Sequence, residues 1–361
     1  MEPFGAWKQA QAMVRVTALA SAVFVMLLVG APGSGERNDY SSVSEAHRGC
    51  VEDAVDSIVR DAVRTQKRMA ASLLRLHFHD CFVHGCDGSV LLDGNNSEKL
   101  APGNNNSLRG FEVVDALKES ITSKCDIQIS CADILALAAR SAVQSVSASH
   151  VTWSVPFGRY DSKSPYSNLT KDLPGTEDTM DIILKKFAAQ GISDPKQVIA
   201  LIGGGHTIGR THCSFSRRRL YGNLTSISAL YSDPQYVTYL RQECPKLQTD
   251  EQASAIEIDL DNTSRDSFDL GFFRSLREGR VAIRSDMVIG DPANSPDVRA
   301  AVTLCTDDAY AFYNTFASGM EVMGSAHILG REEGEIRTNC RRPNGYSSGG
   351  GGGGGQHYAM P

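Results

Sequence analysis

The sequence predicts a mostly α-helical protein with long connecting loops. Apolar residues recur at three- and four-residue spacing between residues 50 and 80, first in VEDAVDSIVRDAV and again in MAASLLRLHFHD. Strand signals are sparse, and the best of them is a short run near VTWSVPFGR, residues 151 to 159. The segment GNNSEKLAPGNNNS, residues 94 to 107, is rich in Asn, Gly and Pro and predicts a loop.

Three further segments carry a helical pattern. They are residues 110 to 124, CADILALAARSAV at 131 to 143, and MDIILKKFAAQG at 180 to 191, where Gly191 marks a C-terminal stop. The length of 361 residues permits one large domain or two modest ones. The net charge of -6, with no Lys and Arg run longer than 217 to 219, argues against nucleic acid as a partner.

Residues 1 to 35 read as a signal peptide. Lys8 and Arg15 precede an apolar stretch from 16 to 28, and small residues follow, so we expect cleavage between Ala31 and Arg37. A membrane anchor is the alternative, but this run is short and no other stretch approaches the ~20 apolar residues of a span. The prediction is therefore a secreted protein that does not reside in a membrane.

The C-terminal residues 346 to 361 predict a disordered tail after a domain at 36 to 345. Seven consecutive glycines cannot bury enough surface to offset the entropy of ordering them. The GYSSG at residues 345 to 349 matches a hydrolase pattern, but it lacks the surrounding strand and helix that the pattern requires.

Secretion favours disulfides for the nine cysteines, of which eight can pair and one is left over. Asn-x-Ser/Thr triplets agree with the secretory route. They begin at Asn95, Asn105, Asn168, Asn223 and Asn262.

The stretch RLHFHDCFVHGCD, residues 75 to 87, concentrates reactive side chains. On a helix Arg75 and His79 share one face with Phe78 beside them, whereas His77 points elsewhere. A neutral imidazole can take a proton from a substrate, and a guanidinium keeps its charge, so the pair suits heterolysis of a polar bond. The alternative is a zinc site of His77, His79, Cys81 and Cys86, but residues two apart on a helix lie on different faces.

Oxygen-bearing residues follow at once. Asp80, Asp87 and Ser89 offer side-chain ligands and Val83 and Gly85 offer carbonyls, which is the chemistry that calcium prefers, although the spacing is not that of an EF-hand. A bond between Cys81 and Cys86 would hold this loop around the ion.

A second stretch, VIALIGGGHTIGRTHC at 198 to 213, places His206 and Thr207 after three glycines. Together the two stretches resemble the class III secretory peroxidases of plants, from about Tyr40 to Asn344. The resemblance also includes Asn106, Ser107, Arg109, Gly110 and Phe111, SCAD at 130 to 133, and Ser285 with Asp286.

This resemblance implies an all-α, two-lobed fold with haem b between a distal and a proximal helix. It implies that His206 is the axial iron ligand, and that Asp286 accepts the other ring N–H of that histidine. Arg75, Phe78 and His79 match the distal group, and Asn104 matches the amide that receives the Nδ1–H of His79. Pro174 matches the proline beside the aromatic donor. The implied activity is that of a donor:hydrogen-peroxide oxidoreductase acting on phenolic donors.

The same resemblance implies two Ca²⁺ sites and four disulfides. The distal site takes Asp80, Val83, Gly85, Asp87 and Ser89, and the proximal site takes Thr207, Asp261, Ser264, Ser267 through its carbonyl, and Asp269. Ser264 replaces the usual threonine and keeps a hydroxyl ligand. The disulfides are Cys50 with Cys125, Cys81 with Cys86, Cys131 with Cys340, and Cys213 with Cys244, and Cys305 remains a buried thiol.

Several positions depart from the family pattern. The usual Cys-Pro is missing at Cys50, His84 replaces the usual asparagine, and residues 270 to 273 replace polar and tyrosine residues. The third glycine before His206 predicts an additional loop residue. We expect a monomeric peroxidase of the cell wall or apoplast, or else of the vacuole. The alternatives are a secreted haem glycoprotein with weak activity and a calcium or zinc module without haem.

Overall fold

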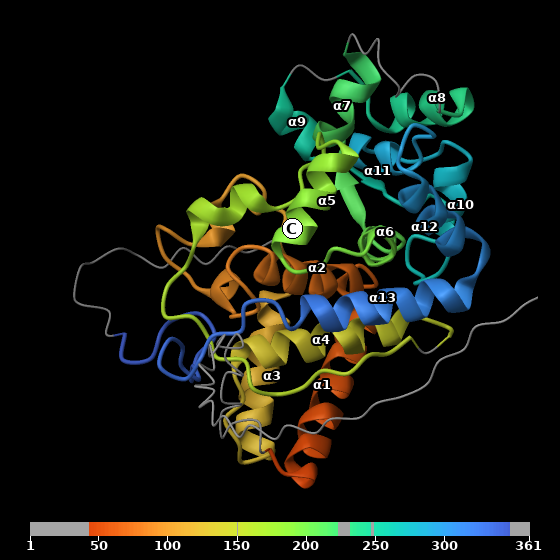
Figure 1. The fold of residues 1–361 in the computed structure, drawn as a ribbon. Coiled ribbons are helices and arrows are strands. Elements are labelled where there is room, and N and C mark those ends of the chain that lie inside the picture. Colours follow the sequence, from red (N-terminus) through yellow and green to blue (C-terminus); the bar gives the residue numbers. More distant parts are fainter. Residues whose placement is uncertain (1–42, 150, 223–231, 247–248, 347–361) are drawn as a thin grey trace, which may run out of the picture. The chain divides into compact units, whose positions relative to one another are not determined.

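Helices account for most of the described chain (Figure 1). The computed structural model describes residues 43–149, 151–222, 232–246 and 249–346, so the signal peptide, its cleavage region, Asn223 and residues 347–361 lie outside the described residues. Among the described residues, no helix combines the length and the apolar character needed to cross a bilayer. The α-helices are α1 (Glu45–Thr65), α2 (Met69–Cys81), α3 (Phe111–Lys124), α4 (Cys131–Val146), α5 (Met180–Ala189), α6 (Pro195–His206), α7 (Cys213–Tyr221), α8 (Pro234–Glu243), α9 (Asp250–Ser254), α10 (Gly271–Arg277), α11 (Arg284–Ile289), α12 (Pro296–Asp307) and α13 (Ala309–Met323). Short 3₁₀ helices are η2 (Ser89–Leu91), η3 (Glu98–Leu100) and η4 (Ser167–Asp172).

One helical group consists of α1 to α4, which contact one another. Helix α1 begins where the Ser44 side chain accepts the His47 N–H, and it buries one valine stripe: Val51, Val55, Val59 and Val63. Helix α4 begins with Ser130 accepting the Asp133 N–H, and most of its residues are buried because α1, α2 and α3 cover it. The apolar periodicity read from the sequence therefore matches the faces that this group buries.

A second helical group joins α6 with α10, α12 and α13, and α6 also contacts α2. Glycines allow this close approach. A Cβ at Gly203 would come within 2.1 Å of the Phe273 ring, and one at Gly204 within 2.3 Å of the Phe316 ring. The expectation of an additional loop residue before His206 is wrong, because α6 continues without interruption through the three glycines to His206.

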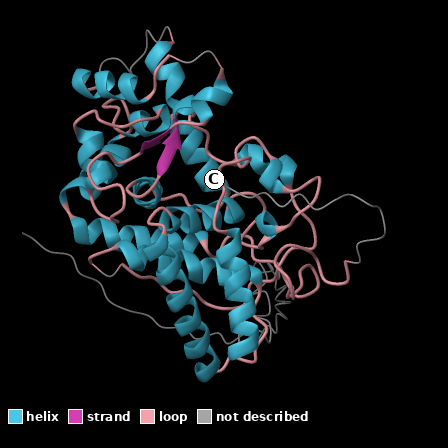
Figure 2. Cartoon of the chain, turned by 180° about the vertical axis from the view of Figure 1, so that it is seen from behind, coloured by secondary structure: helices cyan, strands magenta, loops and turns pink. Residues whose placement is uncertain are grey.

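The described residues contain two short strands (Figure 2). Strand β1 (Arg210–His212) pairs antiparallel with β2 (Glu257–Asp259). The strand signal near VTWSVPFGR is wrong, because residues 151 to 159 form no strand in the described chain. Alternate side chains there are buried, and Trp153 packs edge-on against Phe316 at 5.7 Å, but no other described segment pairs with this backbone to form a ladder.

The described residues form four disulfides: Cys50–Cys125, Cys81–Cys86, Cys131–Cys340 and Cys213–Cys244. Cys305 is a buried free thiol on α12, and burial raises its pKa to about 12. A neutral thiol in an apolar core behaves as a small apolar side chain.

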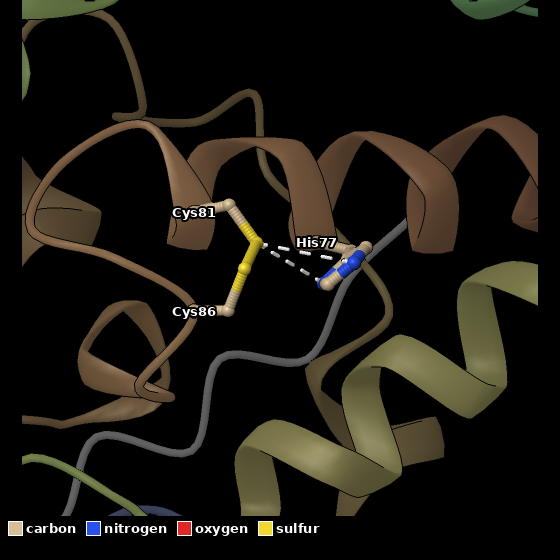
Figure 3. Close-up of side chains that lie close together, drawn as sticks. All are labelled: His77, Cys81 and Cys86. Carbon is tan, nitrogen blue, oxygen red and sulfur yellow. Dashed lines mark hydrogen bonds between the residues drawn. A yellow bond between two sulfur atoms is a disulfide. The ribbon is translucent and has the colours of Figure 1, made fainter. Parts of the chain in front are cut away.

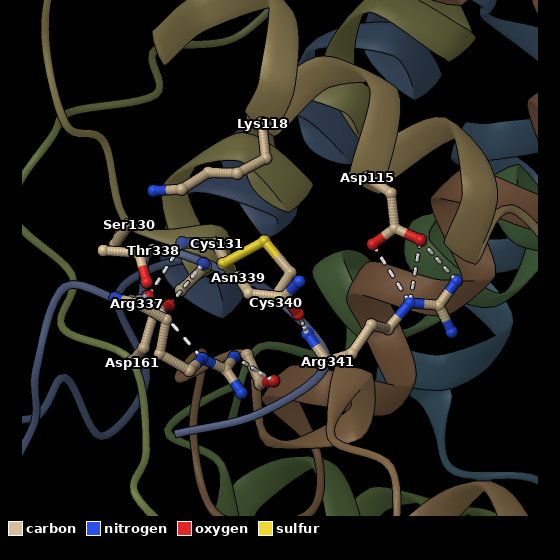
Figure 4. Close-up of a disulfide and its surroundings, with 12 residues drawn as sticks. Asp115, Lys118, Ser130, Cys131, Asp161, Arg337, Thr338, Asn339, Cys340 and Arg341 are labelled. Atoms are coloured by element: carbon tan, nitrogen blue, oxygen red, sulfur yellow. Dashed lines mark hydrogen bonds and ion pairs between the residues drawn. A yellow bond between two sulfur atoms is a disulfide. The ribbon is translucent and has the colours of Figure 1, made fainter. Parts of the chain in front are cut away.

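Buried polar contacts surround the Cys131–Cys340 bond (Figure 4). The Asp161 carboxylate accepts the N–H groups of Cys131, Ala132 and Arg337 at 3.0, 2.9 and 2.9 Å. The Arg337 guanidinium is fully buried, and its Nη2 donates to the Gly88 carbonyl at 2.5 Å. Asp161 thus joins the start of α4 to the C-terminal segment, and Arg337 joins that segment to the loop after α2.

Lys118 on α3 is buried in the same region, and its Nζ donates to the Ile129 carbonyl at 2.5 Å. Burial lowers the pKa of Lys118 from 10.5 to about 8. Between these values the unfolded chain binds more protons than the folded one, so Lys118 should make the protein more stable as the pH rises from about 8 to 10.5. We expect the free energy of unfolding in urea to rise more between pH 8 and 10.5 in the wild type than in Lys118→Met. Equal slopes of this free energy against pH in the two proteins would contradict the prediction.

Candidate active site

Helix α2 carries the distal residues. His79 is buried, its Nδ1 lies 2.6 Å from Asn104 Oδ1, and its Nε2 accepts from Arg75 Nε at 3.1 Å. Since the Asn104 oxygen can only accept, Nδ1 carries the proton and Nε2 keeps its lone pair. Asn104 is itself held, because its Nδ2 donates to the Glu98 carbonyl at 2.9 Å. The geometry presents His79 as a base at Nε2.

Burial and the neighbouring Arg75 charge keep His79 neutral. Burial lowers its pKa well below 6.5, the Arg75 charge lowers it further, and the bond to Asn104 partly opposes both. Arg75 is clamped to the following loop, with Nη1 donating to the Ser107 carbonyl at 3.0 Å and Nη2 to the Ser107 hydroxyl at 3.1 Å. Burial lowers the pKa of Arg75 to about 10, so it remains a cation at neutral pH.

Phe78 and His77 stand between Arg75 and His79 in the sequence and have different neighbours. The Phe78 ring stacks on Phe82 at 4.1 Å and meets the His79 ring edge-on at 5.8 Å. His77 is buried against the Cys81–Cys86 disulfide, with Nδ1 3.6 Å from Cys81 Sγ (Figure 3). Burial lowers the pKa of His77 to about 3. The zinc alternative is wrong, because the two sulfurs bond to each other and the His79 ring is bound to Asn104 and Arg75.

His206 is the last residue of α6, which contacts α2. Its Nδ1 lies 2.8 Å from Oδ1 of Asp286, a fully buried carboxylate on α11. The side chain of His206 is 30% exposed, and the Phe272 ring meets it edge-on at 5.8 Å. With Nδ1 committed to a carboxylate, Nε2 is the ring atom that remains for a metal.

The loop after α2 gathers the first oxygen cluster. Asp80, Asp87 and Ser89 are fully buried, Val83 and Gly85 lie between them, and Gly85 has a φ of +129°. Burial raises the pKa of Asp80, and the Asp87 charge raises it further. Ser89 Oγ and Glu98 Oε2 are buried and have no hydrogen-bond partner among the described residues. Converging carboxylates with unpartnered oxygens fit a hard divalent cation such as Ca²⁺.

A second oxygen cluster joins Thr207, which directly follows His206, to residues 261 to 269. Thr207 Oγ1 donates to the Asp269 carbonyl at 3.0 Å, and Ser264 Oγ lies 3.0 Å from Asp261 Oδ2 and 2.8 Å from Asp269 Oδ1. Ser267 lies in the same turn, with its N–H donating to the Ser264 carbonyl at 2.7 Å. The cluster brings together two carboxylates and two hydroxyls, which also suits calcium.

Two residues beside the site make contacts that the sequence did not predict, although Ser107 belongs to a motif that resembles the peroxidases. Glu98 is buried beside the first oxygen cluster, and burial raises its pKa to about 7. Ser107 accepts hydrogen bonds from the Arg75 guanidinium. Their signal was weak, because both lie in a polar segment that predicts only a loop. Pro174 is half-buried in the connection between η4 and α5.

Comparison with known sequences defines the class of protein. A sequence model of the peroxidase family matches residues 55–308. The chain is 40% identical over 299 residues to Peroxidase 49 of Arabidopsis thaliana, covering 81% of this chain and 87% of that protein. It is 37% identical over 297 residues to Peroxidase C2 of Armoracia rusticana, covering 81% and 84%.

The chain therefore belongs to the peroxidase family. It is an α-helical haem peroxidase enzyme, and the resemblance to class III plant peroxidases read from its motifs is confirmed. Family membership implies haem and calcium in general, and hydrogen peroxide with an electron donor as substrates.

Proposed function

We propose that this chain is a secreted, monomeric peroxidase that holds haem b through Nε2 of His206 and oxidises phenolic donors. The observation that carries the proposal is the pairing of His79, a neutral base with its tautomer set by Asn104, with the fixed cation Arg75. When bound, haem supplies the redox-active iron that exchanges electrons with peroxide and donor. Asp286 makes the His206 imidazole more basic by accepting its Nδ1–H.

Proton movement is the work of the chain's own residues. His79 Nε2 removes the proton from one peroxide oxygen and returns it to the oxygen that leaves. Arg75, held by Ser107, stabilises the negative charge that develops on the leaving oxygen without moving. Pro174 is proposed to lie beside the donor.

The supporting sites follow the same proposal. Asp80, Val83, Gly85, Asp87 and Ser89 hold a distal calcium ion, and Thr207, Asp261, Ser264, Ser267 and Asp269 hold a proximal one. The first cluster adjoins the end of the helix that carries His79, and the second adjoins His206, so each ion braces one side of the active site. Four sequon asparagines, Asn95, Asn105, Asn168 and Asn262, are exposed, which supports a glycosylated protein of the wall, apoplast or vacuole.

An optical spectrum with and without peroxide tests this function. The purified protein should show a haem Soret band, and guaiacol should be oxidised only when peroxide is added. A Soret band without peroxide-dependent turnover would leave a weakly active haem glycoprotein, and the absence of any band would leave a calcium module.

Asn104→Val should slow peroxide consumption by about tenfold, because the buried His79 Nδ1–H loses its acceptor and the ring its orientation. Stopped-flow spectra after mixing with peroxide would measure the rate. Asn339→Val, in the distant C-terminal segment, is the matched control and should keep the wild-type rate. An unchanged rate in Asn104→Val would remove Asn104 from the site.

A further inference from the structure

His84 is held on two sides although it lies in a surface loop. Its Nδ1 lies 3.1 Å from Asp87 Oδ2, and its ring stacks on the Tyr166 ring with centroids 3.9 Å apart and planes 16° apart. The His84 side chain is 36% exposed, whereas Asp87 is completely buried. The hydrogen bond at the edge of the ring and the stack on its face together hold the His84 imidazole in one orientation.

The contact with Asp87 decides how that carboxylate is presented. Asp87 Oδ1 accepts the Ser89 N–H at 2.9 Å, and Oδ2 accepts the Nδ1–H of His84. A carboxylate oxygen has two lone pairs, so each oxygen retains one that can reach a cation. With both oxygens bonded, the plane of the carboxylate is set before any ion arrives.

Tyr166 belongs to residues 162 to 166, which contact both Asp87 and Glu98. Its N–H donates to Glu98 Oε1 at 2.9 Å, and its hydroxyl receives the Ser162 Oγ–H at 3.1 Å. The Ser162 N–H donates to the Asp87 carbonyl at 2.7 Å. The His84 ring therefore joins the loop that contains Asp87 to residues 162 to 166. The same residues also bind the Glu98 carboxylate through the Tyr166 N–H.

We propose that His84 is a positioning residue of the distal calcium site, with Tyr166 as its brace. This inference rests on the proposed calcium site in the Asp87 loop. His84 holds Asp87 in the orientation of a ligand, and the Tyr166 stack prevents the imidazole from turning away to solvent. The consequence is slower release of the distal ion, since partners of metal ligands contribute to affinity by orienting them.

Two variants separate the hydrogen bond from the stack. His84→Phe keeps a ring for Tyr166 but removes the donor to Asp87, and Tyr166→Leu keeps the donor but removes the stack. The calcium-loaded holoenzyme is mixed with excess chelator, and a calcium-sensitive dye follows release. In both variants one of the two proposed ions should leave about tenfold to hundredfold faster, the scale for partners of metal ligands, while the ion near Asp261 keeps the wild-type rate.

His47→Phe is the matched control, because His47 is an exposed histidine on α1 that contacts Ser44. It should release both ions at the wild-type rate. If His84→Phe does not fold, Tyr166→Leu and His84→Ala carry the test, because alanine has neither the ring nor a donor. Wild-type release rates in these variants would overturn the role of His84 and leave the calcium site intact, whereas a wild-type protein that holds no distal calcium would remove both proposals.

Discussion

Replacing His79 by leucine is expected to slow peroxide consumption at least ~10²-fold while the protein keeps its fold and its haem. His79 is the buried base whose Nε2 is free of a proton, and leucine fills a similar space without any atom that accepts one. The haem should stay because its proposed ligand, His206, is on another helix. Stopped-flow spectra at several peroxide concentrations give the rate constant, and the Soret band reports haem content.

His77→Leu is the matched control for that experiment. His77 is also a buried, neutral histidine of α2, but its ring contacts the Cys81–Cys86 disulfide rather than Arg75 or Asn104. Its removal should leave the peroxide rate constant at the wild-type value once protein concentration is normalised to haem. A His79→Leu protein with an undiminished rate constant would assign the base to another residue.

Asp161→Ala is expected to lower the free energy of unfolding by about 3–5 kcal/mol, the scale for removing one partner of a buried ion pair. The substitution leaves the fully buried Arg337 guanidinium without its nearest carboxylate, at 3.7 Å. It also leaves the N–H groups of Cys131, Ala132 and Arg337 without their acceptor. Urea unfolding with the disulfides intact would measure the change.

Asp307→Ala provides the comparison for Asp161→Ala. Asp307 pairs with Arg277 at 2.7 Å, but both side chains are more than half exposed, at 58% and 60%. An exposed pair contributes at most about 1 kcal/mol, so this variant should unfold close to the wild type. Equal, small effects of the two substitutions would show that the network around Asp161 does not stabilise the fold. Asp161→Asn, which keeps the shape, should fall between them.

Helices α1 to α5 were predictable because each one carries its own apolar stripe, whereas the helices after α6 were not predicted. The pattern at 110 to 124 became α3 (Phe111–Lys124), and the two patterns between 50 and 80 became α1 and α2. The strand signal at 151 to 159 failed for a general reason: alternation reports one buried face, whereas a strand also needs a partner backbone. The partners that did pair, β1 and β2, are three residues each and lie far apart in sequence.

Some residues of the active site were predictable from local spacing, and others were not. Arg75, Phe78 and His79 belong to one helix, so their spacing alone placed them together. Glu98 and Tyr166 contact each other across 68 residues of sequence, and no local pattern marks either of them. His84 is the clearest case, since its role depends on a ring that lies 82 residues further along the chain.

By itself the sequence determined the helical class, the face that carries Arg75 and His79, and the family, because periodicity and motif spacing are local properties of the chain. The family resemblance also implied the contacts of His79 with Asn104 and of His206 with Asp286, and the tertiary structure has both, whereas what braces Asp87 was decided by the tertiary structure alone. Each of these depends on a hydrogen bond between segments brought together by folding. Such bonds leave no periodic pattern in the sequence, because each one joins a single residue to a single buried partner from another segment.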